Sequence, residues 1–325
     1  MKRIIIFFVS ILGLIACNKT AQKQATEEKK VSIPLFSADS AYSYIQKQVD
    51  FGPRVPNTQA HISCAEYLAN TLQSFGAQVL NQQAELTAFD GTKLNAVNII
   101  GSFQPENKNR ILLFAHWDSR PWADQDPDPN NRKKPIAGAN DGASGVGVLL
   151  EIARQIGAQQ PEVGVDIIFF DAEDYGAPEH LSNAETQHSW CLGSQYWANN
   201  PHIPGYKARY GILLDMVGAH GATFYREQVS EYYASHVLTK VWKKANELGF
   251  SNYFLNMKGG AITDDHLYIN QIIKIPSIDI IQRDINSPYN FGNYWHTVND
   301  TMDNIDKNTL YAVGTTLLNV IYNEK

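Results

Sequence analysis

The sequence predicts an α/β fold with a largely parallel sheet. Apolar runs typical of buried strands alternate with amphipathic stretches typical of helices, which is the pattern of strands joined by crossover helices. Several apolar runs lead directly into acids or histidines, as expected where the carboxyl ends of strands form a ligand-binding edge. The chain has 325 residues, of which 44% are hydrophobic and 18% charged. This length suits one large globular domain or two modest ones.

The N-terminus has the features of an export signal. Lys2 and Arg3 precede a short apolar run that ends in Leu14-Ile15-Ala16-Cys17, so residues 1–16 are expected to be a signal peptide. The run is too short to span a bilayer comfortably. Its ending resembles the bacterial lipoprotein signal, in which the cysteine is lipidated; an ordinary signal peptide with a chance cysteine is the alternative. We expect a periplasmic protein, anchored to the cell envelope through Cys17 and a polar tether over 17–36.

Charge and cysteine content bear on the partners of the protein and on a possible disulfide. The formal net charge of −6 becomes −8 once the two basic residues of the leader are removed. No basic patch with interleaved aromatic residues is present, so nucleic acid is not an expected partner. Outside the cytoplasm Cys64 and Cys191 could form a disulfide, but two buried free thiols fit the sequence as well.

A single catalytic domain is expected over residues 37–325, without repeats or an internal linker. In its first half, Ser37 caps a helix to residue 49, and a second helix over 58–75 ends at Gly76. Alternation predicts strands over 77–86 and 96–103, which we expect to be neighbours in one sheet because only a turn at Asp90-Gly91 separates them. A buried strand over 110–115 and a helix over 146–156 follow.

The second half continues the alternation. A buried strand begins at residue 165 and is followed by a helix near 193–199, a strand over 210–214 and a helix over 231–248. The last strong strand is predicted over 272–281. Asp306 then caps a final helix that ends at about residue 322.

Two groups of polar residues come between these elements. His116 and Asp118 follow the strand over 110–115, and in an extended segment both side chains point to the same side, since side chains alternate. A long loop over 119–135 comes next, and loops of this length are often functional. Asp141 stands just before a helix and could be an ordinary cap. The small residues around it predict instead a close approach to something bulky or charged.

The stretch 165–176 carries the strongest signal. Asp171, Glu173 and Asp174 follow an apolar run within a few residues. Adjacent carboxylates repel each other, so a fold tolerates them away from water only with a cation or shared protons nearby; a solvated turn is the alternative. At the end of a strand, Glu173 and Asp174 should point to opposite sides and so have different roles.

Other acids and one histidine complete the pattern. Asp215 ends the strand over 210–214, and Asp264 and Asp265 form a second acidic pair. Asp141 and His296 lie in loops that could reach the same edge of the sheet. Nitrogen and oxygen ligands without thiolate favour zinc or another first-row metal. The alternative is that these are unrelated solvated acids.

Five motifs, HWD, GANDGAS, FFDAED, LLD and WHT, resemble in order and spacing those of the zinc aminopeptidase family, and most closely its animal-type glutaminyl-peptide cyclotransferases. The resemblance covers nearly all of residues 37–325. It implies a three-layer sandwich with a central, largely parallel mixed sheet flanked by helices. In the dinuclear aminopeptidases the matching ligands would be His116, Asp141, Asp174, Asp215 and His296, with Glu173 as general base. In the cyclotransferases one zinc would be held by Asp141, Asp174 and His296, and Asp215 and Asp264 would share protons with catalytic Glu173.

Three features favour the cyclotransferases: Trp295 directly before His296, the doubled acid at Asp264, and the strand end at Asp215. Two features do not follow from the cyclotransferase pattern. Most relatives carry Glu where this chain has Asp174. The presence of His116, with Asp118 beside it, leaves a second metal or a supporting role open.

The resemblance also suggests aromatic residues that would bind the substrate. Trp295 and Phe291 are the stronger candidates, and Trp190 is a weaker one for which core packing is the favoured reading. The expected function is zinc-dependent cyclisation of N-terminal glutamine in peptides to pyroglutamate, with release of ammonia. A zinc aminopeptidase is the alternative enzyme. A metal-binding lipoprotein that captures peptides without turnover is a third hypothesis, although such a binder would not need a base at Glu173.

Overall fold

A six-stranded mixed sheet forms the centre of the fold, in the order β1-β2-β4-β3-β5-β8. The strands are β1 (Gln78–Thr87), β2 (Lys93–Phe103), β3 (Arg110–His116), β4 (Gly164–Phe170), β5 (Gly211–Asp215) and β8 (Ser277–Ile281). β3, β4, β5 and β8 pair in parallel. The antiparallel pairs are β1 with β2 and β2 with β4. The predicted fold class is therefore confirmed, as is the pairing of the first two strands.

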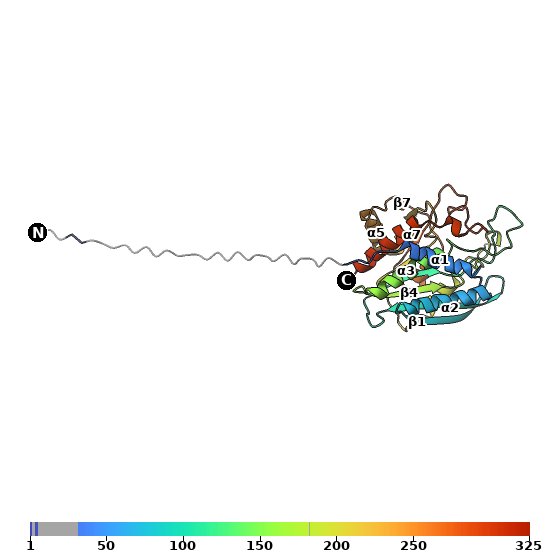
Figure 1. Ribbon diagram of the computed structural model, residues 1–325, viewed down its shortest axis with the longest axis horizontal. Coiled ribbons are helices and arrows are strands. Elements are labelled where there is room, and N and C mark those ends of the chain that lie inside the picture. Colours follow the sequence, from blue (N-terminus) through green and yellow to red (C-terminus); the bar gives the residue numbers. More distant parts are fainter. Residues whose placement is uncertain (2–3, 6–31, 182) are drawn as a thin grey trace. The chain divides into compact units, whose positions relative to one another are not determined.

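Helices cover both faces of the sheet. The longer ones are α1 (Ala38–Asp50), α2 (Gln59–Ser74), α3 (Ala143–Ala158), α4 (Leu192–Asn199), α5 (Gln228–Glu247) and α7 (Lys307–Tyr322). α1, α3 and α7 contact one another on one side of the sheet (Figure 1). The short helix α6 (Asp265–Tyr268) continues into a π-helical turn over Ile269–Ile273. A second, two-stranded sheet pairs β6 (Phe224–Arg226) with β7 (Phe254–Lys258).

The two largest parts of the core lie on opposite faces of the sheet, because β3 and its neighbours are buried on both faces. Ile111, Leu113 and Ala115 belong to the larger apolar cluster, which also contains residues of α1, α2, α3, α5 and α7. Leu112 and Phe114, which alternate with them, belong to a smaller cluster with residues of α4 and the π-helical turn. Strands buried on both faces read as continuous apolar runs, and this is why they could be recognised in the sequence.

The structure is a computed structural model that describes residues 1, 4–5, 32–181 and 183–325. Residues 32–325 form one compact unit. Most of the predicted signal peptide, Cys17 and the greater part of the tether lie outside the described residues, so those predictions stay predictions. Among the helices that are described, none has the length and apolar character needed to cross a membrane.

The predicted strand over 272–281 is wrong in its first half. The apolar run there begins in the π-helical turn and passes through Lys274, whose φ of 61° breaks the extended path. Pro276 follows and has no N–H to donate to a ladder. The side chain of Asn270 then hydrogen-bonds both the N–H and the carbonyl of Ser277, where β8 begins.

The predicted helix caps at Ser37 and Asp306 are confirmed, and the structure shows the state of the two cysteines of the domain. The side chain of Ser37 accepts the N–H of Ser40, and that of Asp306 accepts the N–H of Asn308. Cys64 and Cys191 are both buried free thiols, so the disulfide that the sequence left open does not form in this structure.

Candidate active site

The ends of three neighbouring strands bring the predicted polar groups to one edge of the sheet. β3 ends at His116 and β5 ends at Asp215. β4 ends at Phe170 and is followed at once by residues 171–174, which we call the acid turn. Since β3 pairs in parallel with both β4 and β5, these three carboxyl ends lie side by side.

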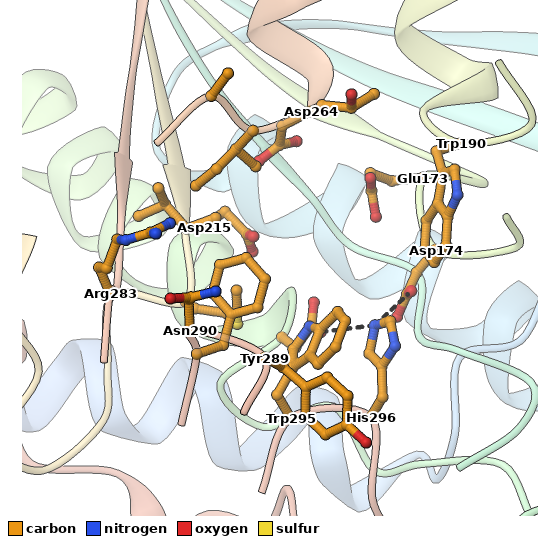
Figure 2. Close-up of a pocket in the computed structure, with 17 residues that line it drawn as sticks. Glu173, Asp174, Trp190, Asp215, Asp264, Arg283, Tyr289, Asn290, Trp295 and His296 are labelled. Carbon is orange, nitrogen blue, oxygen red and sulfur yellow. Dashed lines mark ion pairs between the residues drawn. The ribbon is translucent and has the colours of Figure 1, made fainter. Parts of the chain in front are cut away.

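Asp141, Asp174 and His296 form a first group of potential metal ligands, the first trio. Nε2 of His296 lies 3.2 Å from Oδ1 of Asp174 (Figure 2) and 3.6 Å from Oδ2 of Asp141. All three residues are buried, and one ligand atom of each lies within 4.8 Å of the others. Burial and the charge of Asp141 raise the pKa of Asp174 to about 6. A cation between the two acids would relieve this repulsion.

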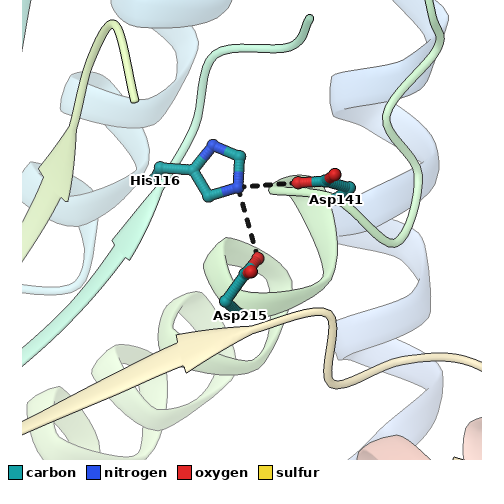
Figure 3. A group of neighbouring side chains, drawn as sticks. All are labelled: His116, Asp141 and Asp215. Carbon is teal, nitrogen blue, oxygen red and sulfur yellow. Dashed lines mark hydrogen bonds and ion pairs between the residues drawn. The ribbon is translucent and has the colours of Figure 1, made fainter. Parts of the chain in front are cut away.

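His116, Asp141 and Asp215 form a second group, the second trio. Nε2 of His116 lies 3.0 Å from Oδ1 of Asp141 and 3.3 Å from Oδ1 of Asp215 (Figure 3). Asp141 belongs to both groups and turns one carboxylate oxygen toward each histidine. The five residues that the resemblance implies as ligands of a dinuclear site are thus present and close together.

The backbone around Asp141 is held by a further acid and by a close contact. Asp300 accepts the N–H of Asn140 at 2.9 Å and that of Asp141 at 3.0 Å. A Cβ on Gly142 would lie 2.5 Å from Cε1 of His116, so no larger residue fits there. The close approach that the small residues predicted is therefore confirmed, and the bulky neighbour is the imidazole of His116.

The acid turn is not an extended strand end, and the prediction that its two acids point to opposite sides is wrong. The turn bends because Ala172 adopts a left-handed conformation with φ of 52°. As a result Glu173 and Asp174 both line one pocket. Asp118 supports this bend by accepting the N–H groups of both residues, each at 3.1 Å.

Although they share the pocket, Glu173 and Asp174 have different neighbours. Asp174 belongs to the first trio, whereas Glu173 lies in a group with Cys191 and Asp264. The thiol of Cys191 donates to Oε1 of Glu173 at 3.1 Å. Burial raises the pKa of Glu173 well above its usual range; the charge of His116 opposes this shift and that of Asp264 adds to it. Burial and the charge of Asp215 likewise raise the pKa of Asp264, so these carboxyls are suited to holding protons.

Asp118 contacts the second trio as well as the acid turn. Its Oδ1 lies 3.3 Å from Nδ1 of His116, as the His-x-Asp spacing predicted. It is not one of the potential ligands in either trio. Its contacts are those of a supporting residue that orients His116 and the backbone of the acid turn.

The pocket beside both trios has a volume of about 360 Å³ and is walled by aromatic rings. Trp190, Tyr289, Phe291 and Trp295 all line it, together with Arg283 on the side facing away from Glu173 (Figure 2). The Trp295 ring centroid is 3.7 Å from that of His296 and 4.9 Å from that of Phe291.

Trp190 also lies against the histidine, with its ring nearly parallel to that of His296 at 5.9 Å between centroids. It is partly exposed and lines the pocket, so the reading of Trp190 as a core residue is wrong.

Two residues of the loop over 119–135 reach the first trio and were not singled out from the sequence. Arg120 is fully buried and pairs with Asp124 at 2.6 Å; its guanidinium also lies 3.4 Å from Oδ1 of Asp174 and 4.5 Å from the ring of Trp190. Oδ1 of Asp124 is 3.6 Å from Nδ1 of His296. The length of the loop was the only signal, because neither residue stands at a strand end.

Comparisons with known proteins agree with this fold. Residues 98–321 match peptidase family M28. Two solved structures are similar over 90% of this chain and 100% of their own: a Zn-dependent exopeptidase from Parabacteroides distasonis, with 60% identity and a TM-score of 0.89, and the glutaminyl cyclase of Tannerella forsythia, with 61% identity and a TM-score of 0.88.

A glutaminyl-peptide cyclotransferase of Bothrops jararaca is 26% identical over 242 residues, which cover 66% of this chain and 61% of that protein. The chain thus matches less than two thirds of the length of that relative. The family match, in contrast, spans well over half of this chain. The resemblance predicted from the five motifs is confirmed, and the chain belongs to peptidase family M28.

Proposed function

We propose that this protein converts N-terminal glutamine of peptides to pyroglutamate and releases ammonia. The observation that carries the proposal is the position of Glu173, which lines the same aromatic-walled pocket as the first trio but belongs to neither trio and accepts the thiol of Cys191. A proton-accepting group beside a metal position is what the reaction requires. The high identity to the Tannerella forsythia glutaminyl cyclase supports the same conclusion.

The residues of the first trio fit zinc. One imidazole and two carboxylates are common zinc ligands, and Oδ2 of Asp174 is buried with no hydrogen-bond partner among the described residues. We propose that Asp141, Asp174 and His296 hold one zinc per chain. When bound there, the metal supplies a Lewis acid for the γ-carbonyl of the substrate. No water has to be activated in this reaction, so a second metal at His116 is not needed.

The chain's own residues supply the proton transfers. The α-amine of the substrate forms a bond to the γ-carbonyl carbon, the bond from that carbon to the amide nitrogen breaks, and ammonia leaves. Glu173 takes the proton released by the amine and returns it to the departing nitrogen. Asp264 and Asp215, whose pKa values are also raised by burial, line the same pocket and would share protons with Glu173.

The aromatic walls have a chemical purpose in this proposal. Water in the pocket could hydrolyse the amide in place of cyclisation, so rings that exclude it favour the intramolecular reaction. Trp295, Phe291 and Trp190 would enclose the glutamine side chain. Arg283 lines the wall opposite Glu173 and is available to the carbonyl groups of the peptide.

The test compares two peptides that differ only in the first residue, glutamine or leucine, with the purified zinc-loaded protein. The proposal expects ammonia from the glutamine peptide and no free amino acid from either. The Glu173→Gln variant is the matched control, since it keeps the size of the side chain but cannot accept a proton. Free leucine without ammonia would contradict the proposal.

A zinc aminopeptidase is the second candidate, and the second trio is what favours it. His116, Asp141 and Asp215 lie within ligand distance of one another, and a peptidase needs an activated water that two metals could provide. Metal analysis separates the two functions: one tightly held zinc per active chain supports cyclisation, and two support the peptidase.

We propose further that the protein is exported and held in the cell envelope by a lipid on Cys17, with peptides and proteins that begin with glutamine as its substrates. The sequence Leu14-Ile15-Ala16-Cys17 after a basic and apolar leader supports this. The polar stretch that follows would give the catalytic domain reach from the membrane surface.

A further inference from the structure

A buried histidine–aspartate pair lies behind the acid turn and outside the pocket. Nε2 of His61, in the first turn of α2, is 2.8 Å from Oδ2 of Asp171. His61 is 2% exposed and Asp171 is fully buried. Neither lines the pocket, so neither can touch the substrate directly.

Asp171 fixes the shape of the acid turn through its carboxylate. Besides His61, Oδ2 accepts the N–H of Val97 at 2.6 Å, and Oδ1 accepts the N–H of Ala172 at 2.7 Å. Ala172 is the residue with φ of 52°, a conformation that a non-glycine residue keeps only where its surroundings hold it. The bend at Ala172 is what turns both Glu173 and Asp174 into the pocket.

His61 also supports the neighbouring strand end. Its ring stacks on that of Trp117, with 4.4 Å between centroids and 22° between planes. Trp117 lies between His116 and Asp118, and Asp118 accepts the N–H groups of Glu173 and Asp174. The imidazole of His61 therefore contacts both segments that hold the acid turn. It hydrogen-bonds Asp171 at the start of the turn, and it stacks on Trp117, which is next to Asp118 in the chain.

Removing the imidazole would leave a buried carboxylate without its side-chain partner. A buried charge that loses its partner moves toward other donors or takes up a proton. For Asp171 either change weakens the hydrogen bond to the N–H of Ala172, and with it the bend. The carboxylate of Asp174, a potential ligand, and that of Glu173 would then lose their fixed positions together.

We propose that His61 is a positioning residue for the reaction: through Asp171 and Trp117 it holds the bend that aims Glu173 and Asp174, and so sets both the turnover rate and the zinc affinity. The part that concerns turnover rests on the proposed function. The part that concerns zinc does not, since it needs only that Asp174 is a ligand.

The test uses three variants of the whole protein. His61→Leu removes the donor and the stacked ring, whereas His61→Gln places an amide N–H near the former position of Nε2. Leu68→Ala, two turns further along α2 and inside the large apolar cluster, is the control for a helix that is merely less stable. For each variant we would measure kcat and KM on a glutamine peptide, zinc affinity by chelator competition, and Tm.

We expect His61→Leu to lower kcat and zinc affinity by about 10–100-fold each, the usual effect of losing a residue that orients a metal ligand, with KM changed much less. His61→Gln should recover most of both, and Leu68→Ala should lower Tm while keeping both. The inference is overturned if His61→Leu keeps wild-type kcat and zinc affinity, if His61→Gln is no better than His61→Leu, or if Leu68→Ala loses as much. If the wild type releases no ammonia, the proposed function fails and the zinc affinities alone decide this inference.

Discussion

Exchanging the acids of Glu173 and Asp174 for amides, one at a time, separates the base from the ligand. Glu173→Gln keeps the length of the side chain, and its carbonyl oxygen can still accept the thiol of Cys191, which now donates to Oε1 at 3.1 Å. It cannot take a proton from the substrate. Asp174→Asn keeps its size as well, but replaces one of the carboxylate oxygens that face His296 in the first trio.

The two variants should lose different properties, kcat in Glu173→Gln and zinc binding in Asp174→Asn. General acid–base catalysis contributes about 10²–10⁴-fold, so kcat of Glu173→Gln should fall by that factor, which corresponds to roughly 3–5 kcal/mol of transition-state stabilisation. Its zinc content and KM should stay close to the wild type. Asp174→Asn should lower the affinity for zinc. The decrease should exceed the ~10–100-fold typical of residues that only orient a ligand.

The assay measures zinc content and the rate of ammonia release on both variants in parallel. Excess zinc should partly restore Asp174→Asn and should not restore Glu173→Gln. Loss of zinc from Glu173→Gln together with retention of zinc by Asp174→Asn would contradict these roles, because Glu173 would then be the ligand and Asp174 the base.

Three further predictions follow from the same structure and sequence. Cys17→Ser should abolish lipid attachment and move the protein from the membrane to the soluble fraction on cell fractionation; finding the wild type soluble would contradict this. Asp141→Ala should lose zinc outright, because Asp141 belongs to both trios, and zinc retained at the wild-type level on metal analysis would count against the ligand assignment. Glu227 caps α5 and hydrogen-bonds His266 of α6, and Glu227→Gln should destabilise the fold in a pH-dependent way. Burial favours the neutral acid, but the hydrogen bond and charge of His266, together with the N–H groups of Ser230 and Val229, outweigh it and lower the pKa of Glu227 from 4.5 to about 2. A depressed pKa stabilises the fold above pH ~4.5, by roughly 3 kcal/mol at most, and this contribution is lost as the pH falls toward 2. The gap in the free energy of unfolding between wild type and variant should therefore narrow from pH 7 to pH 3 in denaturant titrations, and a constant gap would show that folding does not lower the pKa of Glu227.

The strand ends could be predicted from the sequence because strands buried on both faces are unbroken apolar runs, and an acid or histidine at the end of such a run stands out. This pattern predicted that His116, Asp215 and the acid turn lie at one edge of the sheet, as they do. The bend of that turn could not be predicted, since the left-handed conformation falls on Ala172 and not on a glycine.

Contacts between segments that are distant in the sequence could not be predicted from local patterns either. Arg120 reaches Asp174 across 54 positions of the sequence, and His61 reaches Asp171 across 110. The length of its loop is the only sign that Arg120 could have a role, and nothing near His61 marks it as a supporting residue. The prediction of a strand in the apolar run before Ser277 was wrong for a different reason. Periodicity does not distinguish a short helical turn from a buried strand. The chain leaves the extended path at Lys274 because of the left-handed backbone conformation of that residue.

The most direct test of the proposed reaction follows the nitrogen of the substrate's γ-amide. A peptide that begins with glutamine, carrying a heavy-nitrogen label in that amide, is incubated with the zinc-loaded protein, and the products are identified by mass spectrometry. We predict that the label leaves as ammonia while the peptide keeps its first residue as a lactam. Labelled free glutamine, with a peptide shortened by one residue, would contradict cyclisation and establish a peptidase.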